Sequence, residues 1–96
     1  MAKETILIVE DEKSILKLVK YNLEKAGFEA IAAKNGEEAL KILSGRQIDL
    51  AIVDVMLPGV DGLTVCKHIR QNSGTRNMPV IMLTAKGEEI DKIVGF

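Results

Sequence analysis

The strongest constraint on the fold is a short apolar run that ends in a carboxylate. Leu50 to Val53 are four consecutive apolar residues, and Asp54 follows them directly. An uninterrupted run of this length is typical of a strand buried on both faces, as in parallel sheets covered by helices. Ligands of open α/β sheets bind at the carboxyl ends of the strands. Asp54 is therefore predicted to lie where the sheet carries its chemistry.

The segment after Asp54 is rich in residues that fix the shape of a loop. Pro58 restricts φ, Gly59 permits conformations closed to other residues, and Asp61 is placed to cap a helix over residues 62–71. An ordinary turn after a strand uses the same residue types. This segment alone therefore leaves a functional loop and a plain turn both open.

The rest of the chain repeats the order strand, helix. Apolar runs predict further strands at Ile6–Val9 and Val80–Leu83, and a weaker alternation predicts a shorter, more exposed strand at Phe28–Ala33. Apolar residues at helical spacing predict four helices, over 15–26, 38–43, 62–71 and 88–96. Gly27 would end the first helix, and a capping box at Asn35 and Glu38 would begin the second. Because crossovers between parallel strands are right-handed, this order predicts a doubly wound α/β sheet.

Composition limits the number of domains and the kinds of partner that the protein can have. The 96 residues suit one domain, and a net charge of −1 with both signs interspersed gives no basic stripe for direct nucleic-acid binding. No apolar run approaches the ~18 residues that cross a bilayer, and no signal peptide is recognisable. Cys66, the one cysteine, falls in the apolar register of the helix over 62–71, which predicts a buried thiol. We therefore expect a cytoplasmic protein with no membrane partner.

Carboxylates also follow the first predicted strand, at Glu10, Asp11 and Glu12. If the first and third strands are neighbours, Glu10, Asp11 and Asp54 converge at one crevice. Clustered carboxylates repel unless a cation neutralises them, and hard oxygen ligands suit Mg²⁺. With the ion bound, one carboxylate can attack phosphorus. Thr84, at the end of the fourth strand, could donate its hydroxyl to a phosphoryl oxygen, while the small Ala85 leaves the approach open.

Three stretches of the chain resemble a known family. The acids after Ile6–Val9, the segment 54–62 and the segment 79–85 closely resemble the receiver domain of two-component response regulators, in order and spacing over all 96 residues. The resemblance implies a flavodoxin-like, doubly wound parallel sheet with strand order 2-1-3-4, followed in the family by a fifth strand. It also implies one receiver domain over residues 1–96.

The resemblance assigns roles at the carboxylate cluster. Asp54 looks like the aspartate that accepts a phosphoryl group from the phosphohistidine of a sensor histidine kinase or phosphotransfer protein. Asp11 and Asp54 resemble direct ligands of Mg²⁺, or of Mn²⁺ in its place. Glu10 resembles a ligand that acts through water, and Met56 one that acts through its backbone carbonyl.

The resemblance also implies a phosphoryl-binding set and a switch. Thr84 looks like the hydroxyl that moves toward the phosphoryl group, and the backbone N–H groups of Met56 and Ala85 are expected to bind phosphoryl oxygens. His68, the only histidine, lies on a predicted helix far from every strand end, so we interpret it as a surface residue.

The chain departs from the family pattern at its carboxyl end. Phe96 comes before the family's fifth strand, aromatic switch residue, lysine–proline pair and fifth helix, so we expect a truncated receiver whose fifth strand is absent. The strand over 80–84 would then be a sheet edge, and unpaired edges template association with other chains. We therefore expect self-association, through that strand or by exchange of the segment 88–96.

Two alternatives to the signalling function stay open. One is a receiver fragment that cannot signal and only binds metal or self-associates. The other is a metal-dependent phosphohydrolase with Asp54 as nucleophile. Dehalogenase-like phosphatases place a second aspartate two residues after the nucleophile, and this chain has Met56 there. We therefore predict no enzyme activity beyond phosphorylation and dephosphorylation of the chain itself.

Overall fold

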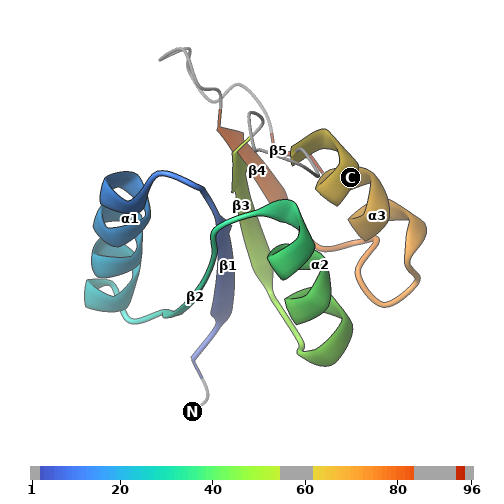
Figure 1. The fold of residues 1–96 in the computed structure, drawn as a ribbon. Coiled ribbons are helices and arrows are strands. Elements are labelled where there is room, and N and C mark those ends of the chain that lie inside the picture. The colour runs from blue at the N-terminus through green and yellow to red at the C-terminus, as the bar shows by residue number, and fades with distance from the viewer. Residues whose placement is uncertain (1–2, 55–61, 84–92, 95–96) are drawn as a thin grey trace.

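The computed structural model describes residues 3–54, 62–83 and 93–94, which form an α/β sheet with helices on both faces (Figure 1). The strands are β1 (Thr5–Val9), β2 (Glu29–Ala33), β3 (Leu50–Asp54), β4 (Val80–Leu83) and β5 (Ile93–Val94). The helices are α1 (Lys13–Lys25), α2 (Gly36–Gly45) and α3 (Gly62–Gln71). None of the helices in these described ranges is long and apolar enough to cross a membrane.

The sheet has the predicted parallel order. Strands β2, β1, β3 and β4 are neighbours in that sequence and all run parallel. The register pairs Val9 with Val53 between β1 and β3, which brings the ends of these two strands to the same level. The predicted adjacency of the first and third strands, on which the convergence of the carboxylates depends, is confirmed.

The end of the chain differs from the prediction. Ile93 and Val94 form β5, which pairs antiparallel with Ile81 and Val80 of β4, whereas a helix was expected over 88–96. The helix prediction is therefore wrong at these two residues, and so is the expectation that β4 is a free edge there. Two consecutive β-branched residues favour a strand, and the pairing gives partners to backbone groups that β4 would otherwise expose. Residues 84–92 lie outside the described part.

The main core lies between the sheet and the helices α2 and α3. Inward-facing residues of β1 and β3 alternate with residues on the other face of the sheet, which is the face that carries α1, as the two-residue period of a strand requires. The buried apolar cluster comprises Leu7, Val9, Ala33, Ala39, Leu43, Ile48, Ala51, Val53, Val65, Cys66, Ile69, Met78 and Val80. This core holds β1 and β3 together directly below the carboxylates that follow them.

The opposite face of the sheet carries α1 alone among the described helices. This helix packs on β2 and β1 and contributes no fully buried residue. It ends as predicted, because Gly27 adopts a φ of 101°, a conformation that L residues with a Cβ rarely adopt. The Phe28 N–H donates to the Leu23 carbonyl at 3.0 Å and the Gly27 N–H to the Glu24 carbonyl at 3.1 Å, which is the Schellman pattern of a helix end.

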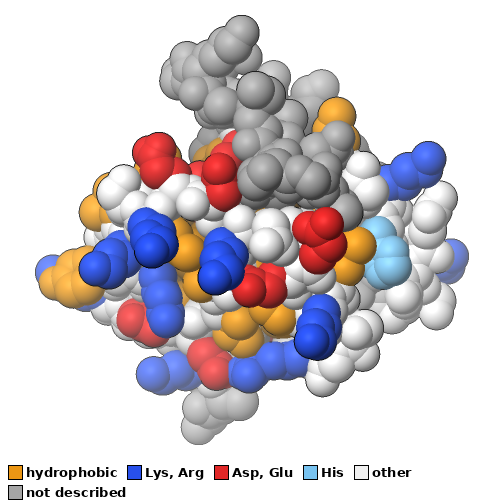
Figure 2. Space-filling model, viewed as in Figure 1, with side chains coloured by type: hydrophobic (Ala, Val, Ile, Leu, Met, Phe, Trp, Pro, Cys, Tyr) orange, Lys and Arg blue, Asp and Glu red, His pale blue; other side chains and the backbone are white. Residues whose placement is uncertain are grey.

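The capping box predicted for α2 forms in part. The Asn35 side chain accepts a hydrogen bond from the Glu38 N–H at 2.8 Å, which satisfies one of the donors that a helix start leaves free. The Glu38 carboxylate accepts instead from the Lys34 N–H at 2.9 Å, one residue before the expected donor. Figure 2 shows basic and acidic side chains interspersed over this face of the molecule, with no basic stripe.

Candidate functional site

Three carboxylates meet at the carboxyl ends of β1 and β3. Glu10 and Asp11 follow the last residue of β1, and Asp54 is the last residue of β3. Each offers an oxygen that lies within 4.8 Å of the other two. Glu10 and Asp54 are buried, at 4% and 7% exposure, whereas Asp11 is exposed. Two of the three charges are therefore shielded from water, and Asp11 is the member of the cluster that solvent reaches.

The backbone around Glu10 fixes where its side chain lies. The Glu10 N–H donates to the Ala33 carbonyl of β2 at 3.0 Å, which continues the β1–β2 ladder one residue beyond the strand. The Glu12 N–H donates to the Glu10 carboxylate at 3.1 Å. This role of Glu12 was not expected from the sequence, although a carboxylate two residues before an N–H is a recognised local turn pattern. The Glu10 carboxylate is thus held toward Asp54.

The pKa of the Glu10 carboxyl is raised from 4.5 to about 7, chiefly by burial. The hydrogen bond from the Glu12 N–H opposes this rise, whereas the charge of Asp54, a hydrogen bond with the Asp54 side chain and the charge of Asp11 contribute to it. A proton on Glu10 therefore relieves the repulsion within the cluster when no cation is bound. A cation at the same place would relieve it without the proton.

The donor set of this cluster fits a hard divalent cation. All three groups are carboxylates, and carboxylate oxygens are the side-chain ligands that Mg²⁺ prefers. Mg²⁺ also keeps several water molecules, which the exposed position of Asp11 allows. Among the described residues, the chain thus provides a half-open set of hard oxygen ligands in front of a buried aspartate.

Comparison with known proteins decides the family. The model of the response regulator receiver domain matches residues 6–96. The chain belongs to the response regulator receiver domain family. The parallel sheet order and the flavodoxin-like fold are those of this family, as its solved members show.

Two curated relatives are similar to this receiver domain over 90 residues each. The alkaline phosphatase synthesis transcriptional regulatory protein PhoP of Bacillus subtilis is 51% identical, with 94% of this chain and 37% of the relative covered. The phosphate regulon transcriptional regulatory protein PhoB of Rhizobium meliloti is 47% identical, with 94% of this chain and 40% of the relative covered. The chain therefore spans about two fifths of the length of these relatives.

Solved structures agree with the fold. A putative response regulator from Chloroflexus aurantiacus has a TM-score of 0.86 at 41% identity, with 91% of this chain and 71% of that chain covered. The response regulator TrrA from Thermotoga maritima, solved in complex with Mg²⁺-BeF, has a TM-score of 0.81 at 40% identity, covering 88% of this chain and 71% of that one. A response regulator protein of the same fold is thus known in complex with Mg²⁺-BeF.

The structure brings together three of the six residues predicted for the site. Glu10, Asp11 and Asp54 form the cluster, whereas Met56, Thr84 and Ala85 lie outside the described residues.

The predictions for two residues of α3 are confirmed: His68 is exposed and Cys66 is buried. Burial raises the pKa of the Cys66 thiol, so this cysteine is poorly suited to be a nucleophile.

Proposed function

We propose that this receiver domain is a phosphoacceptor of two-component signalling, in which Asp54 accepts a phosphoryl group from a sensor histidine kinase or a phosphotransfer protein. The reaction depends on Mg²⁺, or on Mn²⁺ in its place, held by Glu10, Asp11, Asp54 and the Met56 carbonyl. The carboxylate cluster carries the proposal, because it places a buried aspartate beside two further acids. Membership of the family supports the phosphoacceptor role.

The proposed transfer is a displacement at phosphorus. An Asp54 carboxylate oxygen bonds to phosphorus as the bond from phosphorus to the histidine nitrogen breaks, and that nitrogen keeps the electron pair. Bound Mg²⁺ would reduce the repulsion between the anionic attacker and the phosphoryl oxygens. Glu10 must be ionised to take part in the metal site. Because its pKa is raised to about 7, the Glu10 carboxyl has to lose its proton before the reaction can proceed.

Residues outside the described part complete the proposal through the family resemblance. Thr84 would donate its hydroxyl to a phosphoryl oxygen and so sense the modification. The N–H groups of Met56 and Ala85 would bind the other oxygens, as preorganised donors do where charge develops. We propose no activity toward another substrate, and the cytoplasm as the setting, where Cys66 remains reduced.

Mass spectrometry after incubation with a small phosphodonor tests the assignment. The wild-type chain with Mg²⁺ should gain one phosphoryl group that is stable in acid and labile in base, as an acyl phosphate is. Asp54→Asn should abolish the gain, and EDTA should abolish it in the wild type. Asp49→Asn is the matched control, because Asp49 precedes the opposite end of the same strand. Unmodified wild-type protein would favour the alternative, a fragment that binds metal without accepting a phosphoryl group.

Self-association by exchange of the segment 88–96 is a separate part of the proposal. The two residues of β5 make the antiparallel pairing with β4, and a second copy can supply the same residues with the same register. Such an exchanged dimer would form and separate slowly, because β5 must leave β4 first. In size-exclusion chromatography, the exchanged dimer should still elute as a dimer after overnight dilution.

A further inference from the structure

The peptide group between Ala33 and Lys34 takes part in a hydrogen bond on each of its two sides. Its carbonyl accepts from the Glu10 N–H at 3.0 Å, and its N–H donates to the Glu38 carboxylate at 2.9 Å. A trans peptide points its C=O and its N–H in opposite directions. This single group therefore connects a side chain of α2 to the backbone of a residue in the carboxylate cluster.

The position of β2 in the sheet explains why a side chain is needed there. Among the described strands, β2 is the outermost one beside β1, and Ala33 pairs with Val9 in the last pair of their register. The Ala33 carbonyl points toward β1, so the Lys34 N–H points to the open side of β2. No described strand supplies an acceptor on that side, and the Glu38 carboxylate does so instead.

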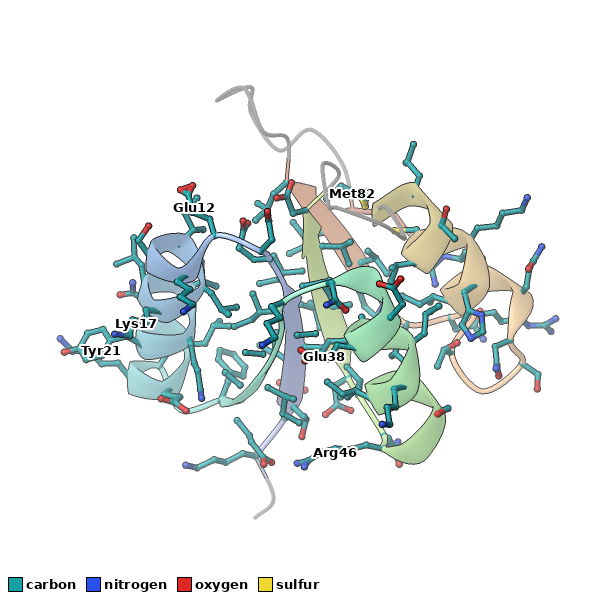
Figure 3. All side chains as sticks on the ribbon, viewed as in Figure 1. Glu12, Lys17, Tyr21, Glu38, Arg46 and Met82 are labelled. Atoms are coloured by element: carbon teal, nitrogen blue, oxygen red, sulfur yellow. The ribbon has the colours of Figure 1, made fainter. Side chains whose placement is uncertain are left out.

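The start of α2 fixes the place of Glu38. The Glu38 N–H donates to the Asn35 side chain at 2.8 Å, and Figure 3 shows Glu38 on this helix. Glu37 lies in the same first turn and carries the same charge, but its side chain is exposed. The Lys34 N–H bonds to Glu38 and not to Glu37. The chain thus contains a natural control for the charge of Glu38.

At the other side of the peptide group, Glu10 is held at two points. Its N–H makes the last hydrogen bond between β1 and β2, and its carboxylate accepts from the Glu12 N–H at 3.1 Å. Without the backbone bond, the Glu10 backbone can rotate, and the carboxylate then leaves its place beside Asp54. A charged acceptor makes a strong hydrogen bond, and hydrogen bonds that share a peptide group strengthen one another. Glu38 therefore strengthens the bond that fixes Glu10.

We propose that Glu38 is a positioning residue for Glu10, which it holds through the Ala33–Lys34 peptide group in the place that metal binding requires. This role rests on the proposed function, in which Glu10 helps to hold Mg²⁺. The Glu38 carboxylate is not a member of the carboxylate cluster, so it acts through the peptide group. Loss of a direct partner of a metal ligand costs about 10- to 100-fold in affinity. Since Glu38 acts one peptide group further away, we expect a smaller effect.

A Mg²⁺ titration of the whole chain, followed by NMR amide shifts, tests this role. Glu38→Ala should raise the Kd for Mg²⁺ roughly threefold to tenfold. Glu38→Gln should recover most of the affinity, because an amide oxygen can accept the same N–H. Glu37→Ala removes the same charge from the same turn and should bind Mg²⁺ like the wild type. Wild-type affinity in Glu38→Ala, or equal loss in Glu37→Ala, would overturn the proposal.

Asn35→Ala separates positioning from stability. It weakens the start of α2 but retains the Glu38 carboxylate as the acceptor of the Lys34 N–H. The folded variant should therefore keep the wild-type affinity for Mg²⁺ although it melts at a lower temperature. A loss of affinity as large as that of Glu38→Ala would show that Glu38 serves only the stability of the helix.

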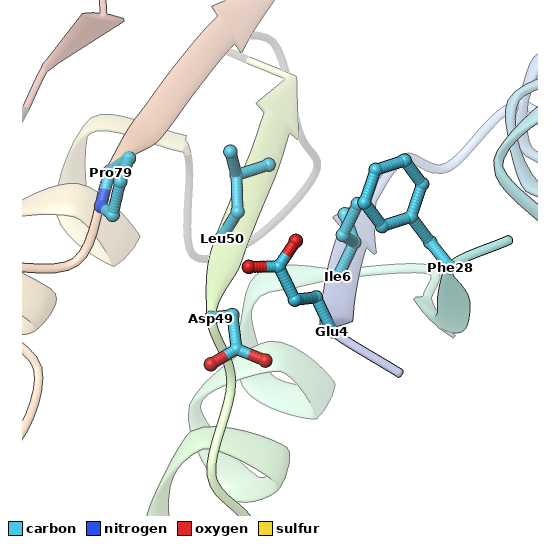
Figure 4. Close-up of a pocket in the computed structure, with 6 residues that line it drawn as sticks. All are labelled: Glu4, Ile6, Phe28, Asp49, Leu50 and Pro79. Carbon is cyan, nitrogen blue, oxygen red and sulfur yellow. The ribbon is translucent and has the colours of Figure 1, made fainter. Parts of the chain in front are cut away.

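Hydrogen exchange in EDTA tests the connection without a metal ion. Glu38→Ala should speed the exchange of the Glu10 amide proton by roughly tenfold or more. The Glu29 amide is the internal control, because it donates to the Glu4 carbonyl at 2.9 Å at the opposite end of the same pair of strands. Figure 4 shows Glu4 at that end, beside a pocket. An unchanged Glu10 amide, or equal acceleration of both amides, would overturn the proposal.

The outcomes also separate this role from the phosphoacceptor function. A wild-type chain that takes up no phosphoryl group, while the Glu38 variants change Mg²⁺ affinity as expected, would refute the phosphoacceptor function and support the positioning role. A wild-type chain that is phosphorylated on Asp54, while Glu38→Ala leaves Mg²⁺ affinity and the Glu10 amide unchanged, would do the reverse.

Discussion

Glu10 and Asp54 share a hydrogen bond between their side chains at the ends of two neighbouring strands. The register that pairs Val9 with Val53 places Glu10 and Asp54 opposite each other, and the pKa of Glu10 is raised to about 7, chiefly by burial and also by its carboxylate neighbours. The hydrogen bond requires a proton between two carboxyl groups. The metal-free site is therefore a proton-binding site near neutral pH, and protons and Mg²⁺ compete for it.

Stability of the metal-free protein should fall as the pH rises through 7. The pKa of Glu10 is raised on folding from 4.5 to about 7, so its favourable contribution is complete below about pH 4.5 and is lost as the pH passes the folded value. We expect the free energy of unfolding in EDTA to drop by roughly 1 to 3 kcal/mol between about pH 5 and about pH 8. Urea titrations measure this. Glu10→Gln should flatten the profile, and an unchanged slope in that variant would refute the assignment to Glu10.

Asp54→Asn should stabilise the metal-free fold and remove its response to Mg²⁺. The substitution deletes one of three neighbouring negative charges, which we expect to be worth on the order of 1 kcal/mol near pH 8. In the wild type, Mg²⁺ should raise the melting temperature, because it binds only the folded chain. Thermal melts with Mg²⁺ and with EDTA check both effects. A variant that still gains stability from Mg²⁺ would show that the ion binds elsewhere.

Gly27→Ala should destabilise the protein by about 1 kcal/mol. Gly27 has a φ of 101°, and no atom lies within 4 Å of the place that a Cβ would take, so the cost comes from the backbone and not from a clash. Gly45→Ala is the control, because Gly45 also has open space around it but no positive φ. It should be neutral or slightly stabilising, since Ala has the higher helix propensity. Equal effects of the two substitutions in urea unfolding would contradict this account.

Asn35→Ala should cost about 1 kcal/mol of stability. It removes the side-chain acceptor of the Glu38 N–H at the start of α2, and no neighbouring group in the described hydrogen-bond pattern replaces it there. Asn35→Ser should retain most of the stability, because a serine hydroxyl can accept the same bond. Chemical denaturation compares the three proteins, and a serine variant as weak as the alanine variant would argue that packing, not capping, explains the loss.

The sequence predicts the parallel strands and the carboxylate cluster well, because both depend on strong local signals. The apolar runs Ile6–Val9 and Leu50–Val53 are stable only as strands that are buried on both faces. The acids that follow two neighbouring parallel strands then lie close together at the same edge of the sheet. The spacing of Ile90, Ile93 and Val94 suits one face of a helix, so the sequence predicts a helix there. Ile93 and Val94 instead pair with the free edge of β4. No local pattern in the sequence predicts this tertiary contact. Met78 lies in the loop before β4, where tertiary packing buries it at 7% exposure.

The uneven covering of the sheet also affects how the molecule opens. α2 and α3 contribute fully buried side chains to the core, whereas α1 contributes none. Segments with few buried contacts open at a lower free energy than the whole chain unfolds. Amide protons of α1 should therefore exchange with solvent earlier than those of β1 and β3. Because α1 begins two residues after Asp11, this early-opening unit adjoins the carboxylate cluster, while the strands that carry Glu10 and Asp54 stay paired.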